Sequence, residues 1–186
     1  MAARTGQLLN YTDMARDCAV SVNTARNWTA VLEASHQVYL LPAWHTNISK
    51  RLYTTPKLHF LDTGLCAYLT EWSSPATLEA GAMSGAILET YVVGEVLKSW
   101  WHVGKDPSLY HYRDKDGREI DLVISHDGCL WPVEVKKAAM IRSEHARAFA
   151  LLAHRGANVG KGAVLSLSTD QLPLDRINMN VPIGWL

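Results

Sequence analysis

The sequence is poor in cysteine, in net charge and in long apolar runs, and each shortage excludes a class of protein. Only three cysteines, Cys18, Cys66 and Cys129, occur in 186 residues, and none belongs to a C-x-x-C pair. An odd number of widely spaced cysteines is typical of reduced thiols in an intracellular protein, not of a disulfide framework. No apolar stretch reaches the roughly 18 residues of a membrane helix, and no signal peptide is recognisable. We therefore expect a cytoplasmic protein with no membrane partner.

Net charge is missing because eighteen Lys and Arg residues balance eighteen Asp and Glu residues. This neutrality argues against an avid, non-specific nucleic-acid binder, although a local basic patch is compatible with it. The eight histidines show no spacing such as H-x-x-x-H, which disfavours a zinc protein. What the chain does contain is apolar material, at 48% of residues and with seven Trp, enough for one ordinary domain or two small ones.

The N-terminal part predicts a helix-turn-helix. Thr12 and Ser21 are candidate N-caps of two short helices, T-D-M-A-R-D-C-A and S-V-N-T-A-R-N-W-T-A-V-L-E-A. The residues of the second helix that helical spacing directs to the core are Val22, Ala25, Trp28 and Leu32. Its outward residues include Asn23, Arg26 and Asn27, whose side chains can reach base edges or phosphates in a major groove. Binding to DNA through these residues and a purely structural or protein-contact role are both open.

A predicted hairpin follows, with strands V-Y-L-L-P-A-W and K-L-H-F-L-D, and would form the wing of a winged helix. Lys50, Arg51 and Lys57 cluster there and are candidate phosphate contacts, with a solvated basic loop as the alternative. Asp62 and Thr63 are expected to cap a last helix, T-G-L-C-A-Y-L. The stretch W-S-S-P-A-T, residues 72–77, has the composition of a linker. We predict a winged helix-turn-helix domain over residues 1–72 and a second domain over residues 78–186.

The second domain centres on residues 119–136, E-I-D-L-V-I-S-H-D-G-C-L-W-P-V-E-V-K. Asp127-Gly128 is a strong signal for a two-residue hairpin turn, and counting outward from it places Asp121 opposite Glu134. Alternation along the strands puts Glu119, Asp121, Glu134 and Lys136 on one face. The residues expected on the other, core face are Ile120, Leu122, Ile124, Val133 and Val135. Pro132 counts against a central strand, because proline cannot donate to the ladder.

Two opposed carboxylates on one face indicate a candidate cation site. Like charges across a sheet repel, and a divalent cation such as Mg²⁺ relieves the conflict because it prefers oxygen ligands. Lys136 could orient a water molecule or offset phosphate charge. The alternative is an ordinary solvent-facing hairpin, in which Lys136 pairs with Glu119.

A third carboxylate, Glu89, lies on the predicted helix S-G-A-I-L-E-T-Y-V-V-G-E-V-L-K-S-W-W. Stepping 100° per residue places it between Val96 and Trp100, on an apolar surface. A carboxylate there needs a cation or an ion-pair partner, so Glu89 is a candidate ligand. A salt bridge to an arginine such as Arg113 is the alternative.

The order of elements in this half is helix, three strands, helix and strand. This αβββαβ succession, with Glu89, then Asp121, then Glu134-Val135-Lys136, resembles the PD-(D/E)XK nuclease superfamily and its restriction-endonuclease-like fold. The fold class is thus α+β or α/β. The resemblance implies Glu89, Asp121 and Glu134 as ligands of Mg²⁺ or Mn²⁺, and Lys136 as the residue that assists the attacking water.

A wider resemblance runs from Tyr11 to about Ser168. The segments Y-T-D-M-A-R-D-C-A-V-S, P-K-L-H-F-L-D-T-G-L, Y-R-D-K-D-G-R-E-I-D and V-E-V-K resemble the C-terminal portion of prokaryotic AAA-type ATPases with a C-terminal domain of unknown function. The chain has no G-x-x-x-x-G-K-[ST] loop, so ATP could act only through a P-loop module missing from it. Either this N-terminal ATPase module was removed or it is absent in nature, and we expect removal.

The function expected from these features is metal-dependent hydrolysis of phosphodiester bonds in DNA, positioned by the winged helix. The alternative is a non-catalytic adaptor or oligomerisation module of the ATPase, in which an exposed pair, Trp100 and Trp101, supplies an interface. Under that alternative the chain could form a homo-oligomer.

Overall fold

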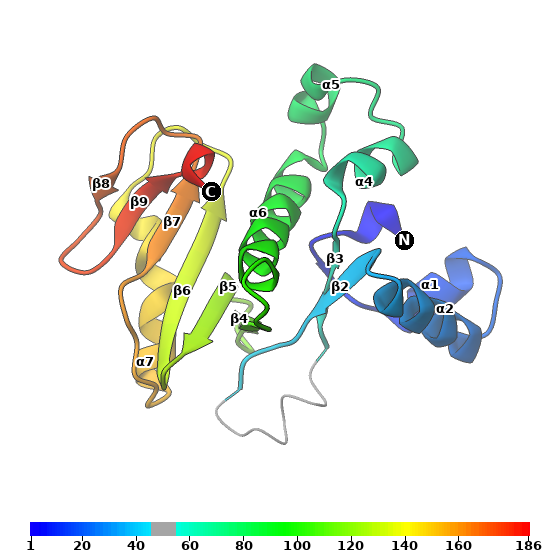
Figure 1. Cartoon of the computed structure of the whole chain (residues 1–186), viewed down its shortest axis with the longest axis horizontal. Coiled ribbons are helices and arrows are strands. Elements are labelled where there is room, and N and C mark those ends of the chain that lie inside the picture. Colours follow the sequence, from blue (N-terminus) through cyan, green and yellow to red (C-terminus); the bar gives the residue numbers. More distant parts are fainter. Residues whose placement is uncertain (46–54) are drawn as a thin grey trace. The chain divides into compact units, whose positions relative to one another are not determined.

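The computed structural model of the chain describes residues 1–45 and 55–186, which combine helices and sheets in two units (Figure 1). The first unit contains residues 1–41 and 55–94. The second contains residues 42–45 and 95–186 among those described. Both units contribute to α6 (Ser84–Trp101), whose bounds agree with the predicted helix, and the division falls after Gly94.

The first unit is built on a three-stranded antiparallel sheet with the order β1–β3–β2. Its elements besides α6 are η1 (Ala2–Arg4), β1 (Gln7–Leu8), α1 (Tyr11–Asp17), α2 (Val22–Ala34), β2 (Val38–Leu41), β3 (Lys57–Phe60), α4 (Thr63–Leu69) and α5 (Pro75–Ala80). The predicted linker stretch, residues 72–77, contains the start of α5, where Ser74 forms a capping box with Thr77.

Helix caps explain where the helices of this unit begin. Ser21 caps α2 through the backbone N–H of Thr24, and Asp62 caps α4 through that of Leu65, as predicted. The cap of α1 was predicted wrongly. Asn10, not Thr12, accepts hydrogen bonds there, from the backbone N–H groups of Thr12 and Asp13.

The buried side of α2 agrees with the predicted one only in part. Ala25 and Thr29 are buried, whereas Val22 is 36% and Trp28 is 53% exposed. Thr29 is compatible with burial because its hydroxyl donates to the carbonyl oxygen of Ala25 at 2.8 Å. A small buried side therefore leaves Val22 and Trp28 outside the core, whereas Ala25 is buried and Leu32 packs partly buried against a core cluster, as predicted.

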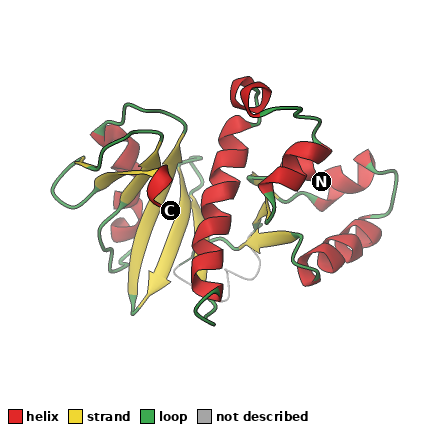
Figure 2. Cartoon of the chain, turned by 45° about the horizontal axis from the view of Figure 1, so that its top comes forward, coloured by secondary structure: helices red, strands yellow, loops and turns green. Residues whose placement is uncertain are grey.

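The second unit contains a six-stranded mixed sheet with the order β4–β5–β6–β7–β9–β8 (Figure 1). Its elements are β4 (Ser108–Arg113), β5 (Glu119–His126), β6 (Cys129–Lys136), η2 (Ser143–Phe149), α7 (Ala150–His154), β7 (Ala163–Ser166), β8 (Leu172–Pro173), β9 (Met179–Pro182) and η3 (Ile183–Trp185). Strands β6, β7 and β9 are parallel, and the other pairs are antiparallel. The helical turns of η2 and α7 lie beside the sheet (Figure 2), where Phe149 and Leu152 pack with Val164 in one core cluster.

The predicted β5–β6 hairpin is confirmed. His126 pairs with Cys129, and Asp127 and Gly128 both have positive φ, at 49° and 72°, as a type I′ turn requires. Strand β6 is nevertheless central, between β5 and β7. Pro132 is tolerated because no residue of β7 pairs with it. Leu130 forms backbone hydrogen bonds with residues 158 and 160, and pairing with β7 begins only at Val133.

A β-bulge in β5 changes the predicted faces of this hairpin. Tyr110 pairs with Val123 and Tyr112 with Ile120, so Asp121 and Leu122 of β5 together oppose the single residue His111 of β4. Ile120 and Val123 consequently share one core cluster, which strict alternation would not allow. The bulge lies at Asp121, the first of the two candidate ligands in this hairpin.

Candidate functional site

The carboxylates of Asp121 and Glu134 meet where the β5–β6 ladder ends. Backbone pairing runs from His126↔Cys129 to Leu122↔Val133, which makes Asp121 and Glu134 the next residues in register. Beyond that point, Asp121 Oδ2 accepts a hydrogen bond of 2.9 Å from the backbone N–H of Val135. A side chain thus replaces a backbone acceptor, and this bond fixes the orientation of the Asp121 carboxylate.

Glu134 is buried, with 8% of the residue exposed. Its Oε1 accepts a hydrogen bond of 2.5 Å from Lys136 Nζ, while its Oε2 has no hydrogen-bond partner among the described residues. Burial and, next, the negative charge of Asp121 raise the pKa of Glu134 to about 7, although Lys136 acts in the opposite direction. Ionisation of the Glu134 carboxyl group is therefore unfavourable in the folded chain, and a bound cation would make it more favourable.

The solvent-facing alternative for this hairpin does not describe these side chains. Lys136 forms its ion pair with Glu134, and Glu119 forms one with Arg113 at 2.5 Å. Glu134 lies next to Val164 of β7 in register, on the side of the sheet that η2 and α7 cover. Because Glu134 is buried and Asp121 is half-buried, these two carboxylates are not part of a solvated surface.

The residues at this site fit a divalent cation with two protein ligands. Mg²⁺ commonly takes one or two carboxylates and completes its shell with water and substrate phosphate. The buried, unbonded Oε2 of Glu134 is an oxygen donor of the required type. Within residues 1–45 and 55–186, no group of three or more His, Cys, Asp or Glu side chains could hold a metal ion.

Glu89 has a cationic partner in the first unit. Its Oε1 accepts a hydrogen bond of 2.9 Å from Lys57 Nζ and lies 3.9 Å from His59 Nε2. The partner is a lysine of β3 and not Arg113. The role of Glu89 as a third metal ligand stays a prediction.

A buried polar network supports this ion pair. The ring nitrogen Nδ1 of His59 is 3.1 Å from Thr90 Oγ1, which is 2.8 Å from Thr5 Oγ1. Thr5, His59 and Thr90 are each at most 1% exposed. Sequence analysis missed this network, although one signal was available: Lys57 and His59 are polar residues two apart in an apolar strand and must share a face.

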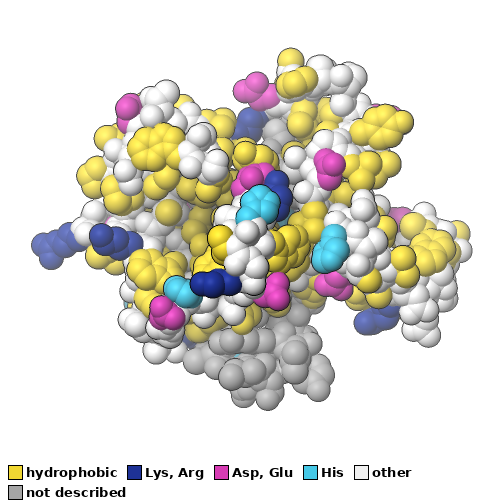
Figure 3. Space-filling view, viewed as in Figure 1, with side chains coloured by type: hydrophobic (Ala, Val, Ile, Leu, Met, Phe, Trp, Pro, Cys, Tyr) yellow, Lys and Arg dark blue, Asp and Glu magenta, His cyan; other side chains and the backbone are white. Residues whose placement is uncertain are grey.

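The predicted DNA contacts fall in three places. Asn23, Arg26 and Asn27 are exposed on α2, and the Arg26 guanidinium lies 4.5 Å from the centre of the Tyr11 ring. Lys50 and Arg51 lie outside the described residues. Lys57 was wrongly expected at an exposed wing, since it is 4% exposed and paired with Glu89. On the face shown in Figure 3, the described Lys and Arg side chains stand apart and form no continuous basic surface.

The tryptophan pair expected for an adaptor is partly buried. Trp100 packs edge-on against the ring of His126, with ring centres 5.3 Å apart, and Trp101 Nε1 donates to Asp106 Oδ1 at 3.1 Å. Neither side chain is the exposed anchor that was predicted.

None of the described helices has the length and apolar character needed to span a membrane.

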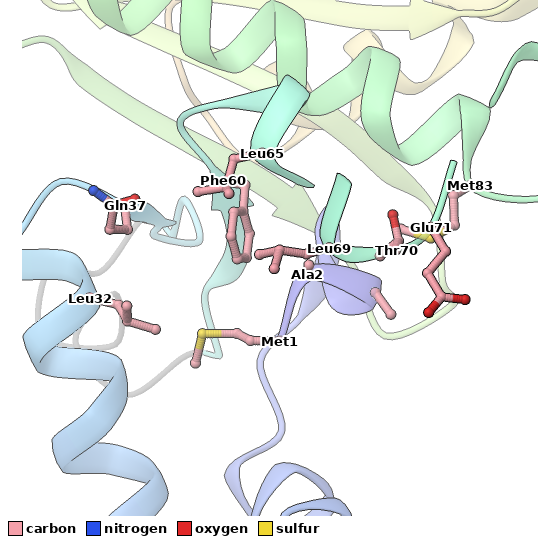
Figure 4. A pocket seen from close by; sticks show the side chains of 11 residues that line it. Met1, Ala2, Leu32, Gln37, Phe60, Leu65, Leu69, Thr70, Glu71 and Met83 are labelled. Atoms are coloured by element: carbon pink, nitrogen blue, oxygen red, sulfur yellow. The ribbon is translucent and has the colours of Figure 1, made fainter. Parts of the chain in front are cut away.

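The first unit also contains an apolar groove of about 670 Å³ (Figure 4). Its apolar lining includes Met1, Leu32, Phe60, Leu65, Leu69 and Met83. Glu71 is its only charged lining residue among those described, so the groove has no pair of groups for acid–base or metal chemistry. The carboxylate pair of the second unit remains the candidate reactive site.

The raised pKa of Glu134 predicts how stability depends on pH without metal. The folded state keeps this proton up to about pH 7, whereas the unfolded state loses it near the ordinary glutamate pKa of 4.5. The stabilisation from Glu134 is therefore complete below pH 4.5 and lost as the pH rises to about 7, on the order of 3 kcal/mol in total. In EDTA, Glu134→Gln should flatten the decline in urea-unfolding free energy between pH 5 and 8. An equal decline in the variant would contradict this assignment.

Comparisons with known proteins give relatives without an established function. The chain is 30% identical over 134 residues to uncharacterized proteins of Mycobacterium tuberculosis and Mycobacterium bovis. The match covers 72% of this chain and 30% of each relative, so the chain spans less than a third of their length. No solved structure matches. A second domain of unknown function, DUF8612, matches residues 1–76. Because the model of the domain of unknown function DUF4143 matches residues 84–186, more than half of the sequence, the chain belongs to the DUF4143 family.

Proposed function

We propose that the second unit is a metal-dependent phosphodiesterase that acts on DNA. The observation that carries this proposal is the buried Glu134 carboxylate, with one unbonded oxygen, beside Asp121 and in contact with Lys136. Two acids and a lysine in this arrangement match the Asp and Glu-x-Lys elements of the PD-(D/E)XK superfamily that the sequence resembles. The helix, three-strand, helix and strand order of the unit supports the same assignment.

The proposed roles follow from the hydrogen bonds of each side chain. A Mg²⁺ or Mn²⁺ ion held by Asp121 and Glu134 would act as a Lewis acid toward the phosphate and lower the pKa of a bound water. Val135 N–H holds the Asp121 carboxylate in a fixed orientation. Lys136, at 2.5 Å from Glu134 Oε1, is placed to orient the attacking water and to offset charge on the phosphate. Glu89 is proposed as a further ligand on the basis of the resemblance.

Hydrolysis at this site would add one water across one P–O bond. The water oxygen bonds to phosphorus, and the bond from phosphorus to one deoxyribose oxygen breaks. One water proton goes to solvent and the leaving oxygen takes up a proton, which gives one phosphate end and one hydroxyl end. The acids and Lys136 act in this reaction only through their charges, and none of them is covalently changed at its end.

The first unit is proposed as the winged helix that positions DNA. The order η1–β1–α1–α2–β2–β3 with an antiparallel β1–β3–β2 sheet supports this reading. Asn23, Arg26 and Asn27 on α2 are the proposed contacts, and Lys50 and Arg51 are proposed in addition from sequence. Charge gives little support, because α1 and α2 contain Asp13, Asp17 and Glu33 against Arg16 and Arg26.

A relation to an ATPase is proposed because the chain belongs to the DUF4143 family. DUF4143 domains are found in AAA-ATPase-associated proteins of prokaryotes. The mycobacterial relatives are more than three times as long as the matched region. We infer that this chain works as the C-terminal part of such an ATPase and that ATP acts only through that other module.

The proposal is tested by a cleavage assay on single- and double-stranded DNA and on RNA, with Mg²⁺ or Mn²⁺. Cleavage is expected with metal, and EDTA or Asp121→Ala should abolish it. Equal cleavage by the wild-type chain and Asp121→Ala would end the assignment of this site.

A further inference from the structure

We propose a second binding site in the second unit, at the end of the β4–β5 hairpin, for a backbone phosphate of a nucleic acid. The site is a cavity of about 240 Å³. Its lining is Trp44, His45, Tyr112, Arg113, Asp114, Lys115 and Arg155. This inference deepens the proposed function, on which its choice of ligand rests, because it adds a contact that holds the strand away from the reacting bond.

The loop that presents Lys115 is held by a buried acid. The Asp114 side chain is 2% exposed, and its Oδ1 accepts hydrogen bonds of 2.9 Å from the backbone N–H groups of Asp116 and Arg118. Its Oδ2 accepts a bond of 2.7 Å from Arg118 Nε. Arg118 offsets the charge of Asp114, the one acid in the lining, and these bonds set the loop in one conformation before any ligand binds.

The remaining charge in the cavity is positive. Arg113 is paired with Glu119, whereas the side chains of Lys115 and Arg155 have no ion-pair or hydrogen-bond partner within the described part of the chain. Arg155 comes from the C-terminal cap of α7, so the two cations are brought together by different elements. The walls formed by Trp44 and Tyr112, whose ring centres are 6.1 Å apart, are apolar and almost fully buried. Two unpaired cations over an apolar floor fit a phosphate anion.

The chain connects this cavity to the carboxylate pair. Glu119, the ion-pair partner of Arg113, precedes Asp121 and the bulge by two residues on β5. Because the carboxylate pair is proposed to act on DNA, a nucleic-acid phosphate is the ligand chosen for this cavity over other anions. The proposed contact would read no sequence, because phosphates carry none.

The test is anisotropy of a labelled single-stranded 20-nucleotide DNA with the whole chain in EDTA, where cleavage cannot occur. Lys115→Ala/Arg155→Ala should weaken binding at least tenfold and reduce the slope of log K against log salt by about 0.7, for one lost phosphate contact. Lys115→Arg/Arg155→Lys should retain most of the affinity. Lys105→Ala/Lys161→Ala, which removes two exposed lysines outside the cavity, is the matched control and should bind as the wild type does.

The arms of the experiment separate the possible outcomes. Stronger binding of a 5′-phosphorylated strand, with competition by inorganic phosphate, would identify a terminal phosphate as the ligand, and equal binding would identify an internal one; both support the site. Asp121→Ala should bind normally in EDTA, so loss of cleavage alone leaves this site standing. Wild-type affinity in the cavity double variant, or no DNA binding by the wild-type chain, would overturn the proposal.

Discussion

Glu134→Gln is expected to lower metal-dependent DNA cleavage by about 10²- to 10³-fold. The change keeps the shape of the side chain but removes the negative charge that is buried beside Asp121. An amide is a weaker ligand for Mg²⁺, and the carboxylate repulsion that favours a cation disappears with it. The measurement is kcat/KM on a labelled oligonucleotide, with the folded state of the variant checked by its urea transition.

Lys136→Met separates the role of the lysine from that of the acids. It should leave Mn²⁺ binding in place, because Lys136 is no ligand, and still lower kcat by about 10²-fold through loss of the group that orients water. Lys136→Arg should restore part of the rate. Lys161→Met, at an exposed lysine elsewhere in the unit, is the control. A Lys136→Met variant that cleaves at the wild-type rate would remove the lysine from the mechanism.

Lys57→Met should destabilise the first unit by about 3–5 kcal/mol. Lys57 is 4% exposed, and the side chain of its partner Glu89 is only 14% exposed. Removing the ammonium group leaves the Glu89 carboxylate in a place with little water, and desolvation of an uncompensated charge is costly. The change should appear as a lower urea midpoint for the transition of this unit, followed by tryptophan fluorescence.

Two further variants show whether the cost comes from the unpaired charge. Lys57→Met/Glu89→Leu removes both charges and should recover most of the lost stability, because buried ion pairs are often replaceable by apolar residues. Arg16→Met breaks the exposed pair with Asp13, and its effect should stay within about 0.5 kcal/mol. If Lys57→Met proves as mild as Arg16→Met, the pair is not the buried interaction described here.

The local signals in the sequence predicted much of the fold. The Asp127-Gly128 turn, the caps at Ser21 and Asp62, and the bounds of α6 were each predicted from a few adjacent residues, and each is confirmed. These features depend on backbone conformation or on helical period, which neighbouring residues determine. Confirmation of the turn also places Asp121 next to Glu134, so the centre of the candidate site was predictable from sequence.

Apart from the cap of α1, which is Asn10 and not Thr12, the errors concern properties that depend on distant residues. The exposure of Trp28 follows from the small buried side of α2, which period alone does not reveal. The bulge at Asp121 depends on the register with β4, and two strands must be paired before it can exist. Lys57 was assigned to a basic wing because of its neighbours in sequence, whereas its charge is matched by Glu89, 32 residues further along the chain.

Calorimetric titration of Mn²⁺ into the metal-free chain at pH 8 tests the central claim most directly, because it asks whether the acids bind a cation without requiring a substrate. The account predicts saturable binding by the wild-type chain, with loss or strong weakening of that binding in Asp121→Ala and Glu134→Gln and retention in Lys136→Met. Absence of Mn²⁺ uptake by the wild-type chain, both alone and with DNA, would contradict it. Binding of Mn²⁺ by the two acid variants with the wild-type affinity would contradict it as well.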